Sequence, residues 1–297
     1  MGMKNESAVH LHRTQHVDKD AAERFEALVG LDDEKQDLVE HLIHVLDPER
    51  AKSWEKKYHS RGLALLQRLR RRPPLVVLAG DVGCGKTELA TSVGTPIARV
   101  LDERLSTFET PSDLRGGGLV GELSLRITAA FDAARAELKG RGILVIDEGD
   151  DLATSRAQNQ AHHEDRAGVN VLIKQIDALA KDRVPLAVIL ITNRLAALDP
   201  ALVRRAHVIQ FRRPTAESRR VLFERLLDGV SVSRAELDTL VAATEREVPF
   251  TYSDIVTRIA EPALRMAMRE SAPLTAKHLL NLVERVEPTP IFRDRAV

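Results

Sequence analysis

Apolar residues recur along this chain in two rhythms, one typical of strands and the other of helices. Short apolar runs rich in β-branched residues predict five strands, at residues 75–79, 105–110, 143–146, 186–191 and 207–211. The intervening segments at 86–101, 122–138 and 169–179 carry apolar positions at helical spacing. Because wholly apolar strands that alternate with helices must be covered on both faces, this order predicts a parallel sheet between two helical layers.

The regions on either side of this alternation lack a strand pattern. Residues 1–24 are polar and predict a flexible tail, which is followed by helical spacing over residues 25–46 and 52–71. Beyond Pro214, four helical stretches remain, at residues 216–227, 234–243, 252–268 and 275–286. We therefore expect three parts: a tail over residues 1–24, a large α/β domain over 25–212, and a small all-α domain over 213–297.

The charge balance and cysteine count narrow the classes of function. The 44 basic and 44 acidic residues give a formal net charge of zero, which lacks the broad positive field of most nucleic-acid binders. Cys84 is the single cysteine, so an internal disulfide is impossible. No segment reaches the ~18 apolar residues that a membrane span needs, and the polar start lacks a signal-peptide core. We expect a cytoplasmic protein with no membrane partner.

A glycine-rich segment follows the first predicted strand and opens a helix. Its sequence, Gly80-Asp-Val-Gly-Cys-Gly-Lys-Thr87, matches the P-loop pattern. Glycines let the backbone N–H groups point at phosphate oxygens, and Lys86 is expected to bind the β- and γ-phosphates of ATP while Thr87 ligates Mg²⁺. The predicted nucleotide-binding residues here are Gly80, Asp81, Val82, Gly83, Cys84, Gly85, Lys86, Thr87 and Glu88.

Polar side chains end two further predicted strands. Asp147 is expected to hold Mg²⁺ and Glu148 to orient and polarise the attacking water. Neighbouring strand residues point to opposite faces, so these two acids cannot be a buried core pair. Asn193 ends the fourth predicted strand, where its amide can position the same water, although asparagine also commonly opens turns.

Arg204 and Arg205 lie between the fourth and fifth predicted strands. Arginine can neutralise charge on a transferring phosphoryl group. Because these two cannot easily reach their own P-loop from that strand end, the site of a neighbouring subunit in a ring is the natural target. A pair of ordinary surface arginines is the alternative.

Together, residues 25–30, the P-loop, the acid pair and Asn193 resemble the nucleotide-binding segments of AAA+ ATPases. The resemblance implies a P-loop NTPase fold with a five-stranded parallel sheet sandwiched by helices, a C-terminal all-α lid and a homo-hexameric ring. It also implies ATP and Mg²⁺ as cofactors. Arg258 matches a sensor 2 arginine that contacts the nucleotide from the lid, with a helix-surface arginine as the alternative.

A narrower resemblance links five segments to the pachytene-checkpoint AAA+ ATPases, which remodel HORMA-domain proteins. The segments are residues 147–156, 169–170, 175–177, 205–206 and Phe211. A compact bacterial form, found in CBASS anti-phage operons, disassembles the HORMA complex that activates a nucleotide second-messenger synthase (a CD-NTase). The resemblance implies a hexamer that partially unfolds a HORMA-domain partner through its central pore. The resemblance matches Arg205 with the arginine finger of that family, the residue that acts on the nucleotide of a neighbouring subunit. It matches Arg204 with the first arginine finger of other AAA+ proteins.

The substrate-gripping pore loop implied by the resemblance follows the second predicted strand, over residues 113–121. Gly118, Leu119 and Val120 would grip an extended peptide there, and residues 154–168 are the candidate second pore loop. A plain flexible loop is the alternative.

Two other functions stay open at this point. One is a DNA-linked AAA+ switch of the loader or initiator type, which the zero net charge disfavours, so we expect no nucleic acid as partner. The other is a protein-quality-control motor, which usually carries an added recognition or protease domain. The basic run of Arg68, Arg70, Arg71 and Arg72 is interpreted as a subunit contact or a solvated face. Cys84 sits at a helix N-terminus, which can lower a thiol pKa, and we interpret it as filling the loop.

Overall fold

The computed structural model describes the chain except for residues 1–8, 113, 115–120, 153–162 and 292–297. The chain forms two compact units, each with its own hydrophobic core. The first comprises Met1–Glu26, Asp33–Ala79 and Thr87–Gln210. The second comprises Ala27–Asp32, Gly80–Lys86 and Phe211–Val297, so two short segments group with the C-terminal part of the chain. No helix in the described part of the chain is long and apolar enough to cross a membrane.

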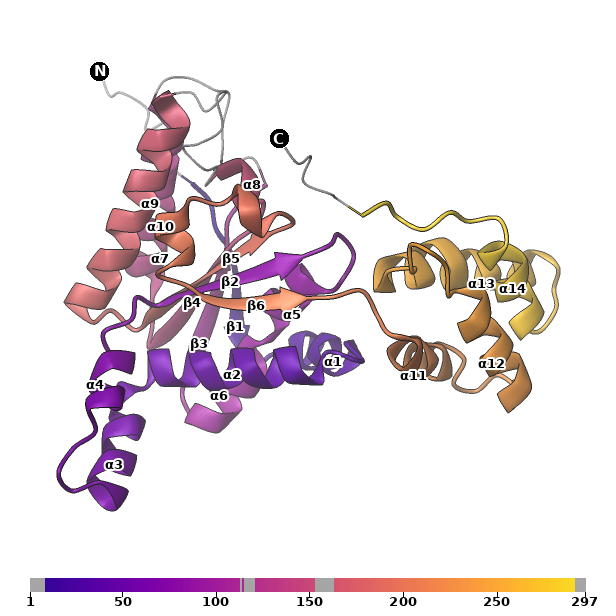
Figure 1. Ribbon diagram of the computed structural model, residues 1–297, viewed down its shortest axis with the longest axis horizontal. Helices are drawn as coiled ribbons and strands as arrows, with labels where there is room; N and C mark the ends of the chain where they lie inside the picture. The colour runs from indigo at the N-terminus through magenta and orange to yellow at the C-terminus, as the bar shows by residue number, and fades with distance from the viewer. Residues whose placement is uncertain (1–8, 113, 115–120, 153–162, 292–297) are drawn as a thin grey trace. The chain divides into compact units, whose positions relative to one another are not determined.

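The first unit is built on a six-stranded sheet with the order β1-β3-β4-β5-β2-β6 (Figure 1). Its strands are β1 (His12–His16), β2 (Leu75–Gly80), β3 (Leu105–Glu109), β4 (Arg141–Ile146), β5 (Leu186–Thr192) and β6 (His207–Phe211). The five predicted strands correspond to β2 through β6. The pairs β2–β5, β3–β4 and β4–β5 are parallel, which confirms the predicted parallel core.

The antiparallel edge strand β1 is absent from the sequence-based prediction. It pairs with β3 from His12 opposite Glu109 to His16 opposite Leu105. The His16 ring is buried, with hydrogen bonds to the hydroxyls of Thr95 at 2.8 Å and Thr107 at 2.9 Å. The expectation of a flexible tail over residues 1–24 is therefore wrong from His12 onward. A polar strand that depends on edge pairing and one buried imidazole gives no apolar alternation to detect.

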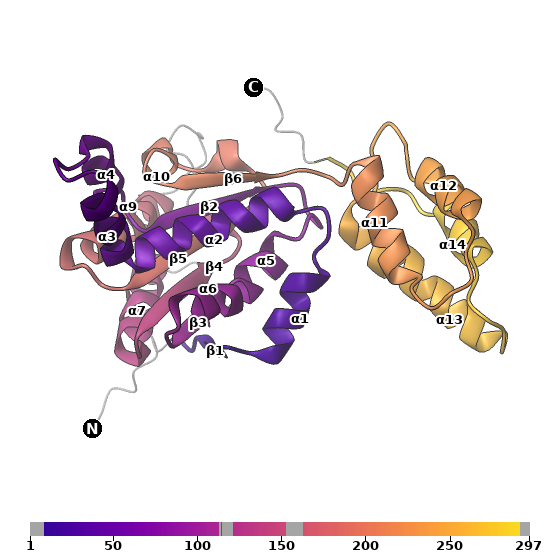
Figure 2. The same ribbon diagram turned by 90° about the horizontal axis from the view of Figure 1, so that it is seen from below.

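Helices cover both faces of this sheet. The helices α7 and α9 lie on one face, where they share a core with Val77 of β2 and Val188 of β5, and α2, α5 and α6 lie on the other (Figures 1 and 2). The helices are α1 (Lys19–Ala27), α2 (Asp32–Leu46), α3 (Pro48–Tyr58), α4 (Ala64–Leu69), α5 (Lys86–Ser92), α6 (Gly94–Leu101), α7 (Glu122–Glu137), α8 (Gly149–Leu152), α9 (His163–Asp182), the 3₁₀ turn η1 (Leu195–Ala197) and α10 (Pro200–Val203).

The single helix expected over residues 25–46 is divided between α1 and α2. Gly30 lies in the gap with φ 68°, a left-handed conformation that glycine adopts without strain. A Cβ at this position would lie 2.6 Å from the side chain of Ser218. The close approach of a second segment therefore ends the helical pattern there.

The second unit contains the four helical stretches expected after Pro214. They are α11 (Ala216–Leu226), α12 (Arg234–Ala243), the π-helical η2 (Asp254–Ala260) followed by α13 (Glu261–Arg269), and α14 (Ala276–Val283). Their core is built around Phe223, Leu240, Phe250 and Ile259. The third stretch changes from π to α geometry near Pro262, which has no N–H to donate to the preceding turn.

Candidate functional site

The loop that joins β2 to α5 is shaped by glycine and by a buried lysine. Gly80 has φ 147°, and a Cβ there would lie 2.3 Å from the carbonyl oxygen of Phe211, so no larger residue fits. Lys86 is buried, and its Nζ donates to the carbonyl oxygens of Gly80 and Asp81 at 2.8 Å each. The loop therefore holds an ammonium group in its centre, as a phosphate-binding loop requires.

Cys84 fills this loop as a neutral thiol. Its side chain is fully buried, and burial raises the pKa of the thiol to about 11, against the smaller opposing effect of Lys86. The position at a helix N-terminus, which can lower a thiol pKa, is outweighed here by desolvation.

The two predicted metal ligands meet at the end of β4. The hydroxyl of Thr87, at the start of α5, donates to Oδ2 of Asp147 at 2.8 Å. A hydroxyl and a carboxylate are hard oxygen ligands of the kind Mg²⁺ prefers, so this pair fits the expected ion. The fold thus brings two side chains that are 60 positions apart in the sequence into direct contact.

Glu148 follows Asp147 in a left-handed backbone conformation. Its φ is 56°, and its N–H donates to Oδ1 of Asp147 at 2.7 Å, while its side chain is exposed. This conformation costs a glutamate on the order of 1 kcal/mol, and such strain tends to occur at functional positions. The turn separates the two acids, so that one faces Thr87 and the other is open to solvent.

Asp150 links the end of β4 to the end of β5 and was missed by sequence reasoning. Its Oδ1 accepts hydrogen bonds from the Thr192 hydroxyl at 3.0 Å and from the backbone N–H of Asn193 at 3.2 Å. The backbone of Asn193, predicted to position the attacking water, is therefore fixed to the turn that carries Glu148. The sequence offered a signal, since Asp150 follows the acid pair by two residues.

Glu88, the last residue predicted at the nucleotide, belongs to a different contact. Its carboxylate accepts from Nη1 of Arg24 in α1 at 3.3 Å, and the same nitrogen donates to Thr91 at 3.0 Å. This pair attaches α1 to α5 at a half-exposed position.

Arg205 is held by an acid, whereas Arg204 is exposed. Nε and Nη2 of Arg205 donate to the two carboxylate oxygens of Asp177 in α9 at 3.2 and 3.3 Å, and Nη1 donates to the carbonyl oxygen of Ala201 at 3.1 Å. A forked arginine–carboxylate pair fixes the direction of the guanidinium. Asp177 therefore orients Arg205.

Asp254 fixes Arg258 in the second unit. Oδ1 of this buried acid accepts from Arg258 at 2.9 Å and from the Thr289 hydroxyl at 2.7 Å. Burial alone would raise the pKa of Asp254, but hydrogen bonds from Thr289, Thr251 and Arg258 together lower it. The carboxylate is therefore ionised and holds the predicted sensor 2 arginine.

Arg213, in the second unit, is the other residue besides Asp150 that sequence reasoning missed. Its Nε donates to Oδ2 of Asp81 in the P-loop at 2.7 Å, and its Nη1 donates to the carbonyl oxygens of Pro249 and Thr289, also at 2.7 Å. Its side chain is almost fully buried. Arg213 thus joins the P-loop to the C-terminal segment, and no local motif marks such a long-range contact.

The predicted pore loop lies outside the described residues at Gly118, Leu119 and Val120, and so do residues 154–162 of the candidate second pore loop. The remaining residues of that second loop, 163–168, form the first turns of α9. Both pore loops stay predictions.

Comparison with known proteins places this site in a family. The model of the "ATPase family associated with various cellular activities (AAA)" matches residues 76–214. "CD-NTase-associated protein 6" of Escherichia coli strain MS 115-1 is 40% identical over 95% of this chain and 96% of its own length. The protein of the same name from Escherichia coli strain KTE188 is 38% identical over 93% and 95%.

Solved structures agree with these relatives. A chain of the "Structure of E. coli MS115-1 HORMA:CdnC:Trip13 complex" superposes with a TM-score of 0.87 at 40% identity, covering 95% of this chain and 98% of that one. The "Structure of Rhizobiales Trip13" gives 0.73 at 34% identity over 94% and 98%. Matches of this extent, together with the P-loop and the Thr87–Asp147 contact, show that the chain belongs to the AAA ATPases and, among them, to the family of CD-NTase-associated protein 6 and the bacterial Trip13 proteins.

Proposed function

We propose that this chain hydrolyses ATP to ADP and phosphate in the presence of Mg²⁺, and uses the energy to remodel a HORMA-domain protein. The contact between Thr87 and Asp147 carries the catalytic half of the proposal, because it joins the two motifs that a magnesium-dependent ATPase needs. The relatives whose names refer to CD-NTases, HORMA and Trip13 support the choice of partner.

Each residue has a defined task in this proposal. Lys86, which contacts the loop carbonyls here, would bind the β- and γ-phosphates, and Thr87 and Asp147 would hold Mg²⁺, which supplies charge neutralisation when bound. Glu148 takes a proton from the attacking water as general base. Asn193, on the backbone that Asp150 fixes, positions that water.

The assembly is proposed to be a homo-hexamer in which an arginine of one subunit completes the site of the next. Arg205, oriented by Asp177, and the exposed Arg204 are the two candidates. Arg258 of the lid would contact the nucleotide within its own subunit. Gly118, Leu119 and Val120 would grip the partner in the central pore. The partner would be a HORMA-domain protein in complex with a CD-NTase, in CBASS anti-phage defence.

The test measures ATP turnover by the purified chain with and without a HORMA-domain protein. Turnover that requires Mg²⁺ and rises with the HORMA protein is the expected result. Stimulation by duplex DNA and none by the HORMA protein would instead support an ATP-controlled DNA switch.

Glu148→Gln tests the chemical step separately. This variant should bind ATP with unchanged affinity and lose about 10²–10⁴-fold in turnover, because general-base catalysis contributes about that much. Glu137→Gln, at the end of α7, is the matched control and should turn over normally. Rapid hydrolysis by the Glu148 variant would contradict the assigned role.

A further inference from the structure

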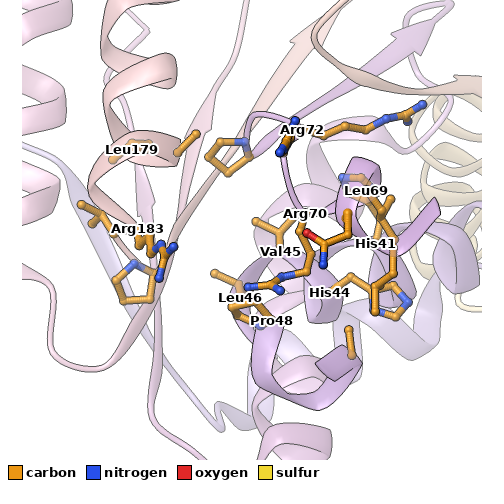
Figure 3. Close-up of a pocket in the computed structure, with 18 residues that line it drawn as sticks. His41, His44, Val45, Leu46, Pro48, Leu69, Arg70, Arg72, Leu179 and Arg183 are labelled. Atoms are coloured by element: carbon orange, nitrogen blue, oxygen red, sulfur yellow. The ribbon is translucent and has the colours of Figure 1, made fainter. Parts of the chain in front are cut away.

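Two adjoining hollows lie on the first unit, and the first of them is where β2 and β5 begin, at the opposite strand ends from Asp147 and Asn193. Pro74 and Pro185, which directly precede these strands, line the first hollow, whose volume is about 430 Å³ (Figure 3). Active sites of parallel α/β sheets lie at the carboxyl ends of the strands, so this hollow is separate from the nucleotide chemistry.

The first hollow is strongly cationic. All its lining residues are described; none is an acid, and six are basic or titratable: His41, His44, Arg70, Arg71, Arg72 and Arg183. The ion pairs found in the described part of the chain involve none of these four arginines. Glu49 is a nearby acid, and it already pairs with Lys52, which lowers its pKa more than Arg70 and Arg183 do.

A histidine in the wall of the hollow is kept neutral mainly by burial. Burial first, and then the charges of His207, His44 and Arg72 against that of Asp37, lower the pKa of His41 to about 4. The buried Nε2 of His41 has no hydrogen-bond partner among the described residues.

Arg183 reaches the hollow from a strained backbone position. It follows the end of α9 with φ 53°, where glycine or asparagine would cost less than arginine. Arg70 follows the end of α4, and the two arginines lie on opposite sides of the hollow (Figure 3). The left-handed turn at Arg183 ends α9, where the N–H of Val184 donates to the carbonyl oxygen of Leu179 at 3.1 Å, and this helix end places Arg183 in the wall of the hollow.

The second hollow is mainly apolar, with Arg50 in its wall, and borders the first. Its volume is about 420 Å³, and it shares His44, Ala51, Leu66 and Leu69 with the cationic hollow. Its wall also contains Leu65, which is 77% exposed, and Trp54, which is 48% exposed and the only tryptophan in the chain. Large apolar side chains left in water beside a hollow are typical of protein-binding surfaces.

We propose that these two hollows, hereafter the α3–α4 surface, bind a segment of a partner protein that carries apolar anchor side chains next to acidic ones. The apolar hollow takes the anchors, and the four arginines take the carboxylates as charge-assisted hydrogen bonds. A small phosphate compound would use the arginines and leave Trp54 and Leu65 in water. Charge complementarity and the apolar hollow together therefore favour an acidic peptide.

The probe is a panel of synthetic fluorescent peptides in which a Trp-Leu pair is followed, after one to four residues, by a Glu-Glu pair. Fluorescence anisotropy with the full chain should show binding by at least one spacing, with dissociation constants of about 1–100 μM, as is usual for short linear segments. The same peptides with lysine for glutamate, or serine for the Trp-Leu pair, should bind at least about tenfold more weakly.

Variants of the chain complete the test. Arg70→Glu/Arg183→Glu and Leu65→Ser should each weaken the acidic peptide at least about tenfold, and the double variant should gain affinity for the lysine peptide. Arg99→Glu in α6 and Leu264→Ser in α13 are matched exposed controls and should bind as the unaltered chain does. Basal ATP turnover should be unchanged in all of them, which separates this proposal from the one above.

Three outcomes would overturn the proposal. One is that no acidic peptide of the panel binds. Another is equal binding of the glutamate and lysine peptides, or equal displacement of the acidic peptide by inorganic pyrophosphate and by unlabelled peptide. The third is a change in oligomeric state of the Arg70→Glu/Arg183→Glu variant in analytical ultracentrifugation, which would make the surface an interface between copies of this chain.

Discussion

Single side chains in this protein act mainly by fixing the direction of their neighbours. Asp150 holds the backbone of Asn193, Asp177 holds Arg205, and Asp254 holds Arg258. In each case a carboxylate that would bind no nucleotide itself orients a residue proposed to act on the nucleotide or on the attacking water. Such positioning residues should affect the rate of the chemical step more than the affinity for nucleotide.

Asp150→Ala tests this expectation at the site. The substitution removes the acceptor for the Thr192 hydroxyl and the Asn193 N–H, so Asn193 should lose its fixed position. We expect ATP turnover to fall by about 10–100-fold, while the affinity for a fluorescent ATP analogue changes by less than about threefold. Asp132→Asn, an exposed acid in α7, serves as control and should leave both values unchanged. A parallel loss of affinity and turnover in the Asp150 variant would instead indicate a general structural role.

At the scale of the elements, β1 is held in place by a buried titratable group, His16. Burial disfavours the charged ring and lowers the pKa of His16 to about 4, against the opposing effect of Asp18. The unfolded chain, with an ordinary histidine pKa near 6.5, binds more protons than the folded chain between these two values. The stabilising contribution is therefore complete above about pH 6.5 and is lost as the pH falls toward 4.

Urea unfolding at about pH 7 and about pH 5 checks this consequence. The free energy of unfolding of the unaltered chain should fall by on the order of 2 kcal/mol for His16, with His41 adding to the loss in the same window. His16→Gln should be less stable at pH 7 but lose less between the two conditions. His12→Gln, on the exposed part of the same strand, should keep the full pH dependence. An equal fall in all three chains would rule out His16 as the cause.

The sequence predicted the elements that carry strong apolar periodicity, and missed those held by long-range polar contacts. Strands β2 through β6 and the lid helices are visible in the pattern because each buries an apolar face. β1 is not, since all five of its residues are polar or charged, and the burial of His16 depends on its long-range hydrogen bond with Thr107. Likewise Thr87 and Asp147 follow from motifs, whereas Arg213 finds Asp81 over 132 positions without a local signature.

At the scale of the whole molecule, the proposed ring makes each active site a product of two subunits. If an arginine acts across the interface, two different inactive variants can form an active site together. One subunit supplies the intact P-loop, and its neighbour, which lacks the P-loop lysine, supplies the arginine. Oligomeric rings with head-to-tail interfaces allow this kind of complementation.

Mixing Lys86→Ala chains with Arg205→Ala chains tests whether the arginine acts on the site of a neighbouring subunit. Each variant alone should be inactive, and an equal mixture should recover about a quarter of the unaltered rate, because about a quarter of randomly formed interfaces then hold both intact halves. The same experiment with Arg204→Ala shows which arginine is the finger. A mixture that stays inactive for both arginines would contradict a finger acting between subunits.

The C-terminal segment is linked to the P-loop through the contacts of one arginine, Arg213. Thr289 gives its hydroxyl and N–H to Asp254 and its carbonyl oxygen to Arg213, and Arg213 in turn grips Asp81. A fusion tag or a protease cut just before Thr289 would therefore disturb the contacts of Arg213, and through them the position of Asp81 in the P-loop. Loosened ATP binding after such an alteration would be a mechanical effect carried through one guanidinium, with every catalytic side chain still intact.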